Sequence, residues 1–412
     1  MRKIALIVAL IGLTFTMNAQ SVKLQSAISD LRNGRLSKAK ENIDAASEHE
    51  ATKMDPKTWI YRGLIYCQLG DPNIKDKYKG LCDNCFEVAY EAAIRCKELD
   101  QSQEFKQLND QVFKAVGSAF YNKTVDTYNE AAKNNDTNLY RETIRLAEEV
   151  IKINNNSGDK SSTSDAYWIA GLSAEMLKDT KAIEKYYKTL VIRKTDKERV
   201  YKTLFDLYRS QNDTTKAINV AKNYSTKTRP EDFKSHLLMS SAYLWIGNIE
   251  KAKESANTAV EKVAAANDST KGLVYCQIGN ILNDAKEFNM AQQYFNQALA
   301  LPNTGDIVKF EANHGLGILY YNHAADYIEA ANKVPETDET GKYEELLNLS
   351  KEQFKLAIPH FQESMKKVEN DQYRVQQYVV ALRALKTIYA RLEMYDQMPD
   401  ITKRLQALGL EN

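Results

Sequence analysis

The stretch from Leu273 to Pro302, LVYCQIGNILNDAKEFNMAQQYFNQALALP, limits the possible folds of this chain more than any other feature. Its apolar residues recur every three or four positions in two blocks, which is typical of two amphipathic helices joined by a tight turn. Gly279 and Ala291 are small residues at the places where the two helices would touch. A lone hairpin of this kind cannot bury its apolar faces, so it needs similar hairpins stacked on either side.

The chain repeats this hairpin about nine times between Gln25 and the C-terminus. We align four alanines as equivalent inward residues of successive second helices, and they lie 35, 35 and 39 residues apart: Ala182, Ala217, Ala252 and Ala291. Independent helices have no reason to keep such an interval. Glycine and proline are also scarce, at 16 and 7 in 412 residues, which favours long uninterrupted helices.

Two of the first helices are predicted to be overlong. The segments 117–122 and 317–322 match in spacing, and each is followed by Glu-Ala-Ala, so we expect their helices to continue to about Lys133 and Val334. The match favours the descent of both halves from one duplicated unit. Pro359 lies inside the helix that follows the second of them, and it predicts a kink or a late helix start there.

Residues 1–19 have the three-part layout of a secretory signal peptide. Arg2 and Lys3 precede the apolar run Ile4–Phe15, and the small residue Ala19 follows. The run is too short for a permanent membrane helix, and no later segment is apolar enough to span a membrane. We therefore expect an exported protein of the periplasm, either associated with the envelope or secreted.

Charge and composition divide the remainder into two expected domains. The formal net charge of +1 becomes about −1 without the leader, so no basic excess points to nucleic acid. Residues 20–157 form N-terminal repeats with a polar, cysteine-bearing insertion near 71–81. Residues 164–412 form C-terminal repeats with a long-helix insertion near 321–356. The polar stretch NNNSGDKSSTS, residues 154–164, separates them as a hinge or a long loop.

The hairpin pattern resembles the tetratricopeptide repeat (TPR) family, whose motif is W-x2-L-G-x2-Y, then A-x3-F, then P. The residues that carry the likeness are Tyr275, Ile278, Gly279, Leu282, Ala291, Phe295 and Pro302, with Trp59, Gly63 and Tyr66 in an earlier copy. With its leader, the chain looks like the exported TPR proteins of Gram-negative bacteria. The resemblance implies a right-handed α-solenoid whose first helices line a concave surface that binds protein segments.

In the register of that family, a mixed set of aromatic, amide and charged residues would point into the concavity. The predicted groove residues are Trp168, Lys202, Asp206, Arg209, Trp245, Asn280, Asn283, Tyr321, Asn322 and Arg383. They suit an extended peptide held by side-chain and backbone hydrogen bonds. Asp206 stands where the family's carboxylate clamp would need Asn, which argues against capture of a C-terminal carboxylate. Tyr321 and Asn322 have a second interpretation, as supports for the overlong helix.

Four of the five cysteines, Cys67, Cys82, Cys85 and Cys96, lie in one hairpin. In an exported protein a disulfide is the leading interpretation, and antiparallel packing allows Cys67 to pair with Cys82 or Cys85. Cys85 and Cys96 are separated by about 16 Å of helical rise, too far to bridge. Cys96 is also too distant to complete a four-thiolate zinc site. Cys82-x-x-Cys85 at a helix start has redox potential, but no thioredoxin-like βαβ pattern surrounds it.

No catalytic motif is present in the sequence. The five histidines are scattered, and none forms H-E-x-x-H, while G-x-S-x-G and P-loop motifs are missing. We therefore expect a non-enzymatic scaffold without a cofactor or metal, which binds a protein segment in its concave groove. Two alternatives remain: a structural subunit of an outer-membrane or secretion assembly bound through other faces, and a thiol-redox accessory that uses Cys82 and Cys85.

Overall fold

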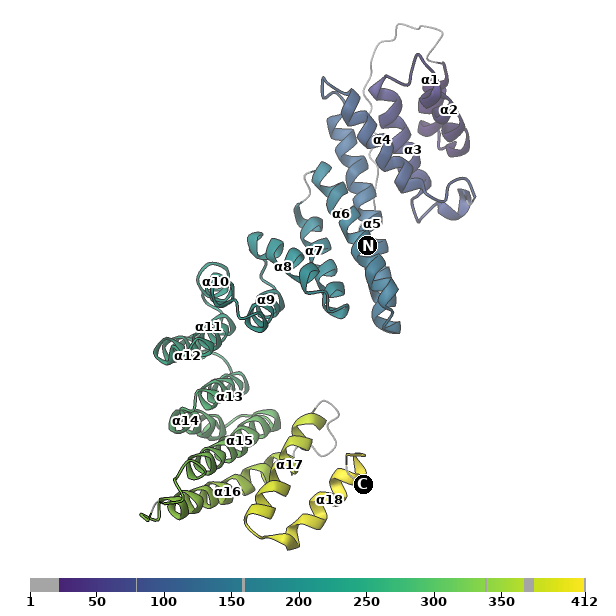
Figure 1. Cartoon of the computed structure of the whole chain (residues 1–412). Helices are drawn as coiled ribbons and strands as arrows, with labels where there is room; N and C mark the ends of the chain where they lie inside the picture. The colour runs from purple at the N-terminus through teal and green to yellow at the C-terminus, as the bar shows by residue number, and fades with distance from the viewer. Residues whose placement is uncertain (1–21, 79, 158–159, 338, 367–373, 411–412) are drawn as a thin grey trace. The chain divides into compact units, whose positions relative to one another are not determined.

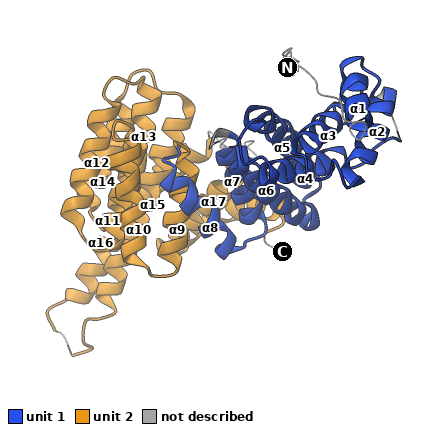
Figure 2. Ribbon diagram, turned by 90° about the horizontal axis from the view of Figure 1, so that it is seen from above, with its two compact units in different colours: residues 1–195 blue, residues 196–412 orange. Residues whose placement is uncertain are grey.

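The regular structure of the described chain is entirely helical. The computed structural model describes residues 22–78, 80–157, 160–337, 339–366 and 374–410. The chain divides into two compact units, residues 1–195 (unit 1) and 196–412 (unit 2), which Figure 2 colours separately. The predicted all-α solenoid is confirmed, whereas the right-handed superhelix stays a prediction.

Unit 1 is a stack of hairpins in which each helix packs against the next along the chain. Its helices are α1 (Val22–Arg32), α2 (Leu36–Glu48), α3 (Pro56–Leu69), α4 (Cys85–Leu99), α5 (Lys106–Asn134), α6 (Thr137–Ser157), α7 (Lys160–Met176) and α8 (Thr180–Ile192). The insertion after α3 contains the short 3₁₀ turn η2 (Lys75–Tyr78), and the Tyr78 hydroxyl donates to the Gly34 carbonyl at 3.1 Å. This contact folds the insertion back onto the α1–α2 turn.

Unit 2 continues the same architecture (Figure 1). Its helices are α9 (Glu198–Ser210), α10 (Thr214–Asn223), α11 (Phe233–Trp245), α12 (Ile249–Val263), α13 (Asp268–Asp284), α14 (Phe288–Ala300), α15 (Asp306–Ala331), α16 (Lys342–Lys366), α17 (Val375–Arg391) and α18 (Met398–Ala407). A π-helical turn, η3 (Tyr224–Thr228), extends α10, and a 3₁₀ turn, η4 (Tyr395–Gln397), precedes α18. The described chain therefore contains nine hairpins, as the repeat pattern predicts.

The odd-numbered first helices contact one another along each stack. In unit 1, α1 contacts α3, α3 contacts α5, and α5 contacts α7; in unit 2, the contacts run from α9 through α11, α13 and α15 to α17. Such a row makes one face of each unit a continuous layer of first helices. Side chains from successive first helices can therefore act together on one ligand.

A repeated turn fixes where each second helix begins. The residues Lys178, Asn212, Gly247 and Lys286 have left-handed φ angles of 54°, 56°, 75° and 60°. The next residue is the N-cap, and the Asp179, Asp213 and Asn248 side chains each accept a hydrogen bond from the backbone N–H three residues on. Such caps satisfy N–H groups that have no partner inside the helix.

This turn corrects the alignment of one repeat. The fully packed residue four positions after the cap is Ile183 in α8, whereas Ala182 is only half-buried. The equivalent residues Ile183, Ala217, Ala252 and Ala291 are therefore 34, 35 and 39 residues apart. The sequence alignment was wrong by one position in this repeat. It matched Ala182, instead of Ile183, to the alanines of the other three copies because all four are small residues.

Tyrosine hydroxyls join one hairpin to the next. Tyr66 in α3 donates to Asp44 in α2 at 2.8 Å, and Tyr294 in α14 donates to Asn257 in α12 at 3.0 Å. Tyr320 in α15 accepts from the Gln292 amide in α14 at 2.8 Å. A ring that packs in the core and a hydroxyl that reaches the neighbouring repeat explain the use of this residue in a solenoid.

The overlong helices are present, and both belong to long hairpins. Helix α5 has 29 residues and α15 has 26, close to the predicted ends at Lys133 and Val334. Helix α16 begins at Lys342 and runs through Pro359, so the proline does not delay the helix start. Ala357, Phe361 and Met365 of α16 are buried.

Two predictions about the organisation of the chain are not tested by this fold. The signal peptide 1–19 lies outside the described residues. The boundary at 157–164 stays a prediction, although α6 reaches Ser157, α7 begins at Lys160, and the two compact units divide after Thr195. Helices thus occupy most of the stretch expected to be a linker.

Candidate functional site

Five of the predicted groove residues lie on three first helices of unit 2. Lys202, Asp206 and Arg209 lie on α9, Trp245 ends α11, and Asn280 lies on α13. We call these five residues the first-helix face of unit 2. Lys202, Arg209 and Asn280 are exposed, whereas Asp206 and Trp245 are half-buried. All five come from helices that contact one another in order.

Lys202 and Asp206 form an ion pair one helical turn apart on α9. The Lys202 Nζ lies 3.1 Å from the Asp206 Oδ2, and both side chains are open to solvent. Exposed pairs at this spacing contribute only about 0.3–0.5 kcal/mol to stability. The two charges therefore remain available to a ligand, which can separate them at low cost.

Arg209 lies over an aromatic support shared by α9 and α11. Its guanidinium is 5.9 Å from the centre of the Phe205 ring, and the Trp245 ring meets Phe205 edge-on at 6.4 Å. Asp284 at the end of α13 is close enough to interact with Arg209. Burial raises the pKa of Asp284, and the Arg209 charge only partly offsets that effect. The cluster is a cation on an aromatic base with an acid beside it.

Asn280 and Asn283 have different environments although both lie on α13. Asn280 is exposed, so its amide can donate to and accept from a ligand. Asn283 is 5% exposed, and its Oδ1 is buried without a hydrogen-bond partner among the described residues. Asn283 therefore belongs to the packed layer beneath the face rather than to its surface.

The remaining predicted groove residues are not gathered on this face. The half-buried Tyr321 ring packs against Phe354 of α16 at 5.6 Å, and its neighbour Asn322 is half-buried too. This geometry matches their second interpretation, as supports of the overlong helix. Arg383 is exposed on α17, two first helices beyond α13. Trp168 belongs to unit 1, where it stacks on Tyr187 at 5.9 Å.

A half-buried histidine, His314, lies on α15, the next first helix of unit 2. His314 stacks on Phe310 at 5.5 Å and meets Phe361 edge-on at 6.0 Å. Its Nδ1 is buried without a hydrogen-bond partner among the described residues. Burial lowers the pKa of His314 to about 4, so the ring is neutral at pH 7. Its ring contacts are those of a packing residue.

The cysteine-bearing hairpin holds four of the five cysteines of the chain. All five cysteines of the structure are in the thiol form, so the disulfide predicted among Cys67, Cys82 and Cys85 stays a prediction. Burial raises the pKa of Cys67 and of Cys96 to about 12. The Cys85 thiol donates to the Cys82 carbonyl at 3.3 Å. Protonated, buried thiols are poor nucleophiles, which disfavours thiol-disulfide exchange through Cys67 or Cys96.

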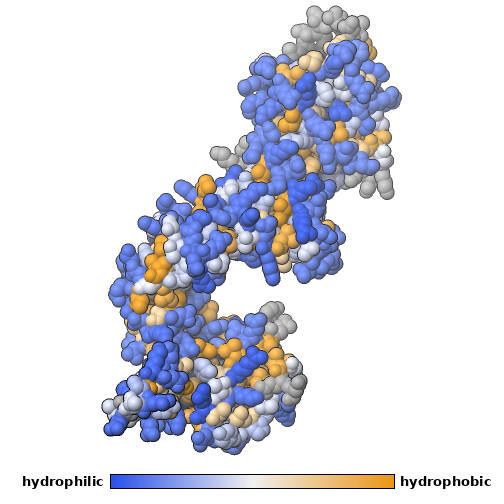
Figure 3. Space-filling view, viewed as in Figure 1, coloured by the Kyte–Doolittle hydropathy of each residue, from blue (hydrophilic) through white to orange (hydrophobic). Residues whose placement is uncertain are grey.

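The described residues show neither a metal cluster nor a membrane helix. No group of three or more His, Cys, Asp or Glu side chains in the described ranges could hold a metal ion. Within the same ranges, no helix combines the length and the apolar character needed to cross a bilayer. On the surface shown in Figure 3, hydrophobic residues form small patches among hydrophilic ones.

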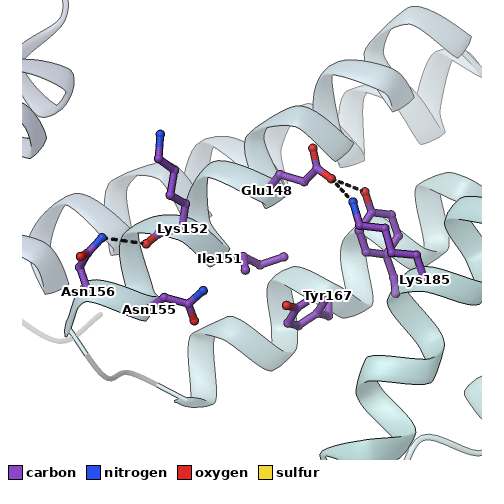
Figure 4. Close-up of a pocket in the computed structure, with 8 residues that line it drawn as sticks. Glu148, Ile151, Lys152, Asn155, Asn156, Tyr167 and Lys185 are labelled. Carbon is purple, nitrogen blue, oxygen red and sulfur yellow. Dashed lines mark hydrogen bonds and ion pairs between the residues drawn. The ribbon is translucent and has the colours of Figure 1, made fainter.

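One pocket in unit 1 was missed by the sequence prediction. It has a volume of about 460 Å³ and lies among α6, α7 and α8 (Figure 4). Its lining residues are Glu148, Ile151, Lys152, Asn155, Asn156, Tyr167, Lys185 and Tyr186. One sequence feature relates to this pocket: Tyr167 and Tyr186 are as far apart in the sequence as Tyr275 and Tyr294.

No protein-family model and no curated protein matches this chain. It is similar to the solved structure of yeast Tom70 at 15% identity and a TM-score of 0.32, over 94% of this chain and 92% of that one. A TPR repeats protein from Bacteroides fragilis matches at 18% identity and a TM-score of 0.26, over 63% of this chain and 97% of that one.

The Cut9–Hcn1 structure, from an APC/C hetero-tetramer, is also similar. It matches at 14% identity and a TM-score of 0.24, over 95% of this chain and 87% of that one. All three TM-scores are low, so the fold described above rests on the helices of this chain and their contacts.

Proposed function

We propose that this protein is a non-enzymatic scaffold whose first-helix face in unit 2 binds a segment of a partner protein. The observation that carries the proposal is the gathering of Lys202, Asp206, Arg209, Trp245 and Asn280 on three successive first helices. An extended segment crossing α9, α11 and α13 would meet both signs of charge, an aromatic ring and an amide in turn. The face is then the concave groove that the TPR resemblance implies.

The chemistry of the face suits binding better than catalysis. Catalysis by side chains needs a nucleophile or a general base held near its substrate, with a pKa close to the working pH. The first-helix face holds a solvent-exposed ion pair, an arginine supported by aromatic rings and an amide. Such groups hold a peptide by hydrogen bonds and charge, and aromatic and arginine side chains often dominate protein interfaces.

The proposal includes the place where the partner is met. With residues 1–19 as a signal peptide, the scaffold works in the periplasm, associated with the envelope or released from the cell. The partner is then an exported protein or the periplasmic part of a membrane protein. Binding through other faces, as a structural subunit of an outer-membrane or secretion assembly, is the competing proposal.

Charge reversal on the face tests the proposal against that competitor. The variant K202E/R209E changes two exposed cations of α9, and pull-down from the native cell compares its partners with those of the parent. The expected result is loss of the main partner, because two attractive contacts become repulsive.

A matched control carries the same change in net charge on other helices. K222E/K351E reverses two exposed lysines of α10 and α16, and it should retain the partner. If both variants retained the main partner, the first-helix face would not be the binding site, and binding through other faces would be favoured.

A further inference from the structure

The pocket among α6, α7 and α8 of unit 1 is built around a fixed carboxylate. The Glu148 Oε1 of α6 accepts hydrogen bonds from the Tyr186 hydroxyl at 2.8 Å and from the Lys185 Nζ, both on α8 (Figure 4). Burial raises the pKa of Glu148, but these two donors outweigh burial and lower it overall. Glu148 therefore stays ionised and occupied by its partners, and it holds α8 against α6.

The floor of the pocket is apolar. The half-buried side chains of Ile151 and Tyr167 form it, and the Tyr167 ring meets the Tyr186 ring at 6.4 Å. The guanidinium of Arg193 lies 5.3 Å from the centre of the Tyr167 ring, so this ring contacts both Tyr186 and Arg193. A floor of this size and rigidity suits one aliphatic or aromatic side chain.

The rim is cationic and rich in amides. Lys152 and Lys185 are exposed on opposite sides of the opening, and Asn155 and Asn156 lie at the end of α6 (Figure 4). The Lys152 Nζ lies 3.9 Å from Glu149, a loose contact on an exposed surface. Asn156 is oriented by bonds to Lys97 and to the Lys152 carbonyl, while Asn155 is exposed at the edge of the pocket.

Unit 2 contains the same frame with a different rim. Tyr275 and Tyr294 meet at 6.1 Å, and the Tyr294 hydroxyl donates to Asn257 of α12, as Tyr186 donates to Glu148. Counting from the hydroxyl acceptors, Lys152 corresponds to Glu261, and counting from the donor tyrosines, Lys185 corresponds to Gln293. The tyrosine pair is thus a structural feature of both copies. The two rim lysines occur in the copy of unit 1 and not in that of unit 2.

The amides of the first copy are also particular to it. Asn155 and Asn156 correspond in position to Ala264 and Ala265. The two asparagines are still part of α6, whereas the two alanines follow the end of α12 at Val263. The polar run at 154–156, which the sequence alone favours as a linker, thereby supplies two hydrogen-bonding groups to the pocket. Their place beside an apolar floor suits a peptide backbone next to a buried side chain.

We infer that this pocket docks a protein segment in which an aliphatic or aromatic side chain is followed by acidic residues. The anchor occupies the floor of Ile151 and Tyr167, the acidic residues lie against Lys152 and Lys185, and the amides bond the backbone of the segment. The opening faces solvent, which suits an extended segment. The pocket lies among α6, α7 and α8 of unit 1, so none of its residues belongs to the first-helix face of unit 2.

Binding of defined peptides to the full chain tests this inference. The probe is acetyl-Gly-Phe-Asp-Glu-Gly-amide, and the readout is the methyl NMR signal of Ile151, with the buried Ile183 of α8 as an internal reference. The expected result is a saturable shift of Ile151 alone, which weakens as ionic strength rises. The variant K152E/K185Q places the corresponding residues of unit 2, Glu and Gln, at the two rim positions, and it should weaken binding at least fivefold. The control K188E changes another lysine of α8 and should not weaken binding.

Three results would overturn the inference. The first is equal binding of acetyl-Gly-Phe-Lys-Lys-Gly-amide, which would remove the role of charge. The second is equal binding of acetyl-Gly-Gly-Asp-Glu-Gly-amide, which would remove the role of the anchor. The third is equal binding of free 3-phenylpropionate, which would make the pocket a site for organic acids rather than for a protein segment.

Discussion

The buried Nδ1 atom of His314 should lower the stability of unit 2, and a substitution at this residue can measure the effect. A buried polar atom without a partner costs about 1–3 kcal/mol, and the His314 Nδ1 is such an atom between two phenylalanine rings. We predict that H314F leaves unit 2 equally stable at pH 7 or stabilises it by about 1 kcal/mol. Urea unfolding followed by Trp245 fluorescence measures this, in a chain whose other tryptophans, Trp59 and Trp168, are phenylalanine.

The same residue should make unit 2 sensitive to acid. The folded pKa of about 4 lies below the usual 6.5, so the unfolded state binds the proton first and stability falls as pH drops from 6.5 to 4. From pH 7 to 5 the loss is about 2 kcal/mol by this linkage. Burial also lowers the pKa of His323 and of His360, which adds loss of the same sign. H314F should shrink the loss, and an unchanged pH dependence would contradict the assignment.

Gly279 and Gly315 make room for one ring. A methyl group on Gly279 would lie 2.7 Å from the Phe295 ring, and one on Gly315 would overlap it as well. We predict that G315A destabilises unit 2 by about 1–3 kcal/mol, the usual range for overpacking. Combined with F295L, which removes part of the ring, the cost of G315A should fall. Additive effects in this double-mutant cycle, measured by urea unfolding, would show that the two sites do not meet.

At the scale of elements, Asp44 joins α2 to α3. Its carboxylate accepts from the Tyr66 hydroxyl at 2.8 Å and from Arg62 at 3.2 Å, and Lys40 lies at 3.0 Å. We predict that D44A lowers the stability of unit 1 by about 2 kcal/mol, because charged hydrogen bonds are lost and Tyr66 loses its acceptor. Thermal unfolding of the full chain provides the measurement.

The control for this prediction is an exposed pair within one helix. Lys106 and Asp110 of α5 lie 3.0 Å apart, and the lysine is largely in solvent. The variant D110A should cost about 0.5 kcal/mol or less. If D44A and D110A had equal effects, the network between α2 and α3 would contribute no more than a surface pair.

The cysteines should differ in their reactivity toward alkylating reagents. Cys67, Cys96 and Cys276 are buried, and burial raises the pKa of each thiol to about 12. We expect iodoacetamide to modify the half-buried Cys82 first in the reduced, folded protein and to reach these three only on unfolding. Peptide mass spectrometry at successive times measures the order. Modification of Cys67 as fast as Cys82 would contradict the packing of this hairpin.

At the scale of the whole molecule, the repeat pattern predicted the nine hairpins because periodicity and turn residues are local signals. The one-position error at Ala182 arose because the N-cap Asp179, rather than the small residue, sets the register. Helix α16 begins at Lys342 and continues through Pro359, where local preference alone predicted a kink or a late helix start. Packing against α15 along its length supplies the stabilisation that the sequence does not show.

The candidate sites were predictable only in part. Lys202, Asp206 and Arg209 share one helix, so their common face follows from helical spacing. The burial of Asn283 and the turn of Tyr321 toward Phe354 depend on neighbouring helices, which spacing does not describe. The pocket of unit 1 needs three helices together, and its two rim amides, Asn155 and Asn156, come from a run that favours a linker when considered alone.

Site-specific photocrosslinking in the native cell tests the central claim most directly. A photoreactive residue replaces Asn280 on α13 in one chain and Asn296 on α14 in the other, and both positions are exposed on helices of the same hairpin. The account predicts that one partner protein is captured from position 280, that K202E/R209E abolishes this capture, and that position 296 does not capture it. Capture of the same partner from 296 but not from 280 would contradict binding on the first-helix face.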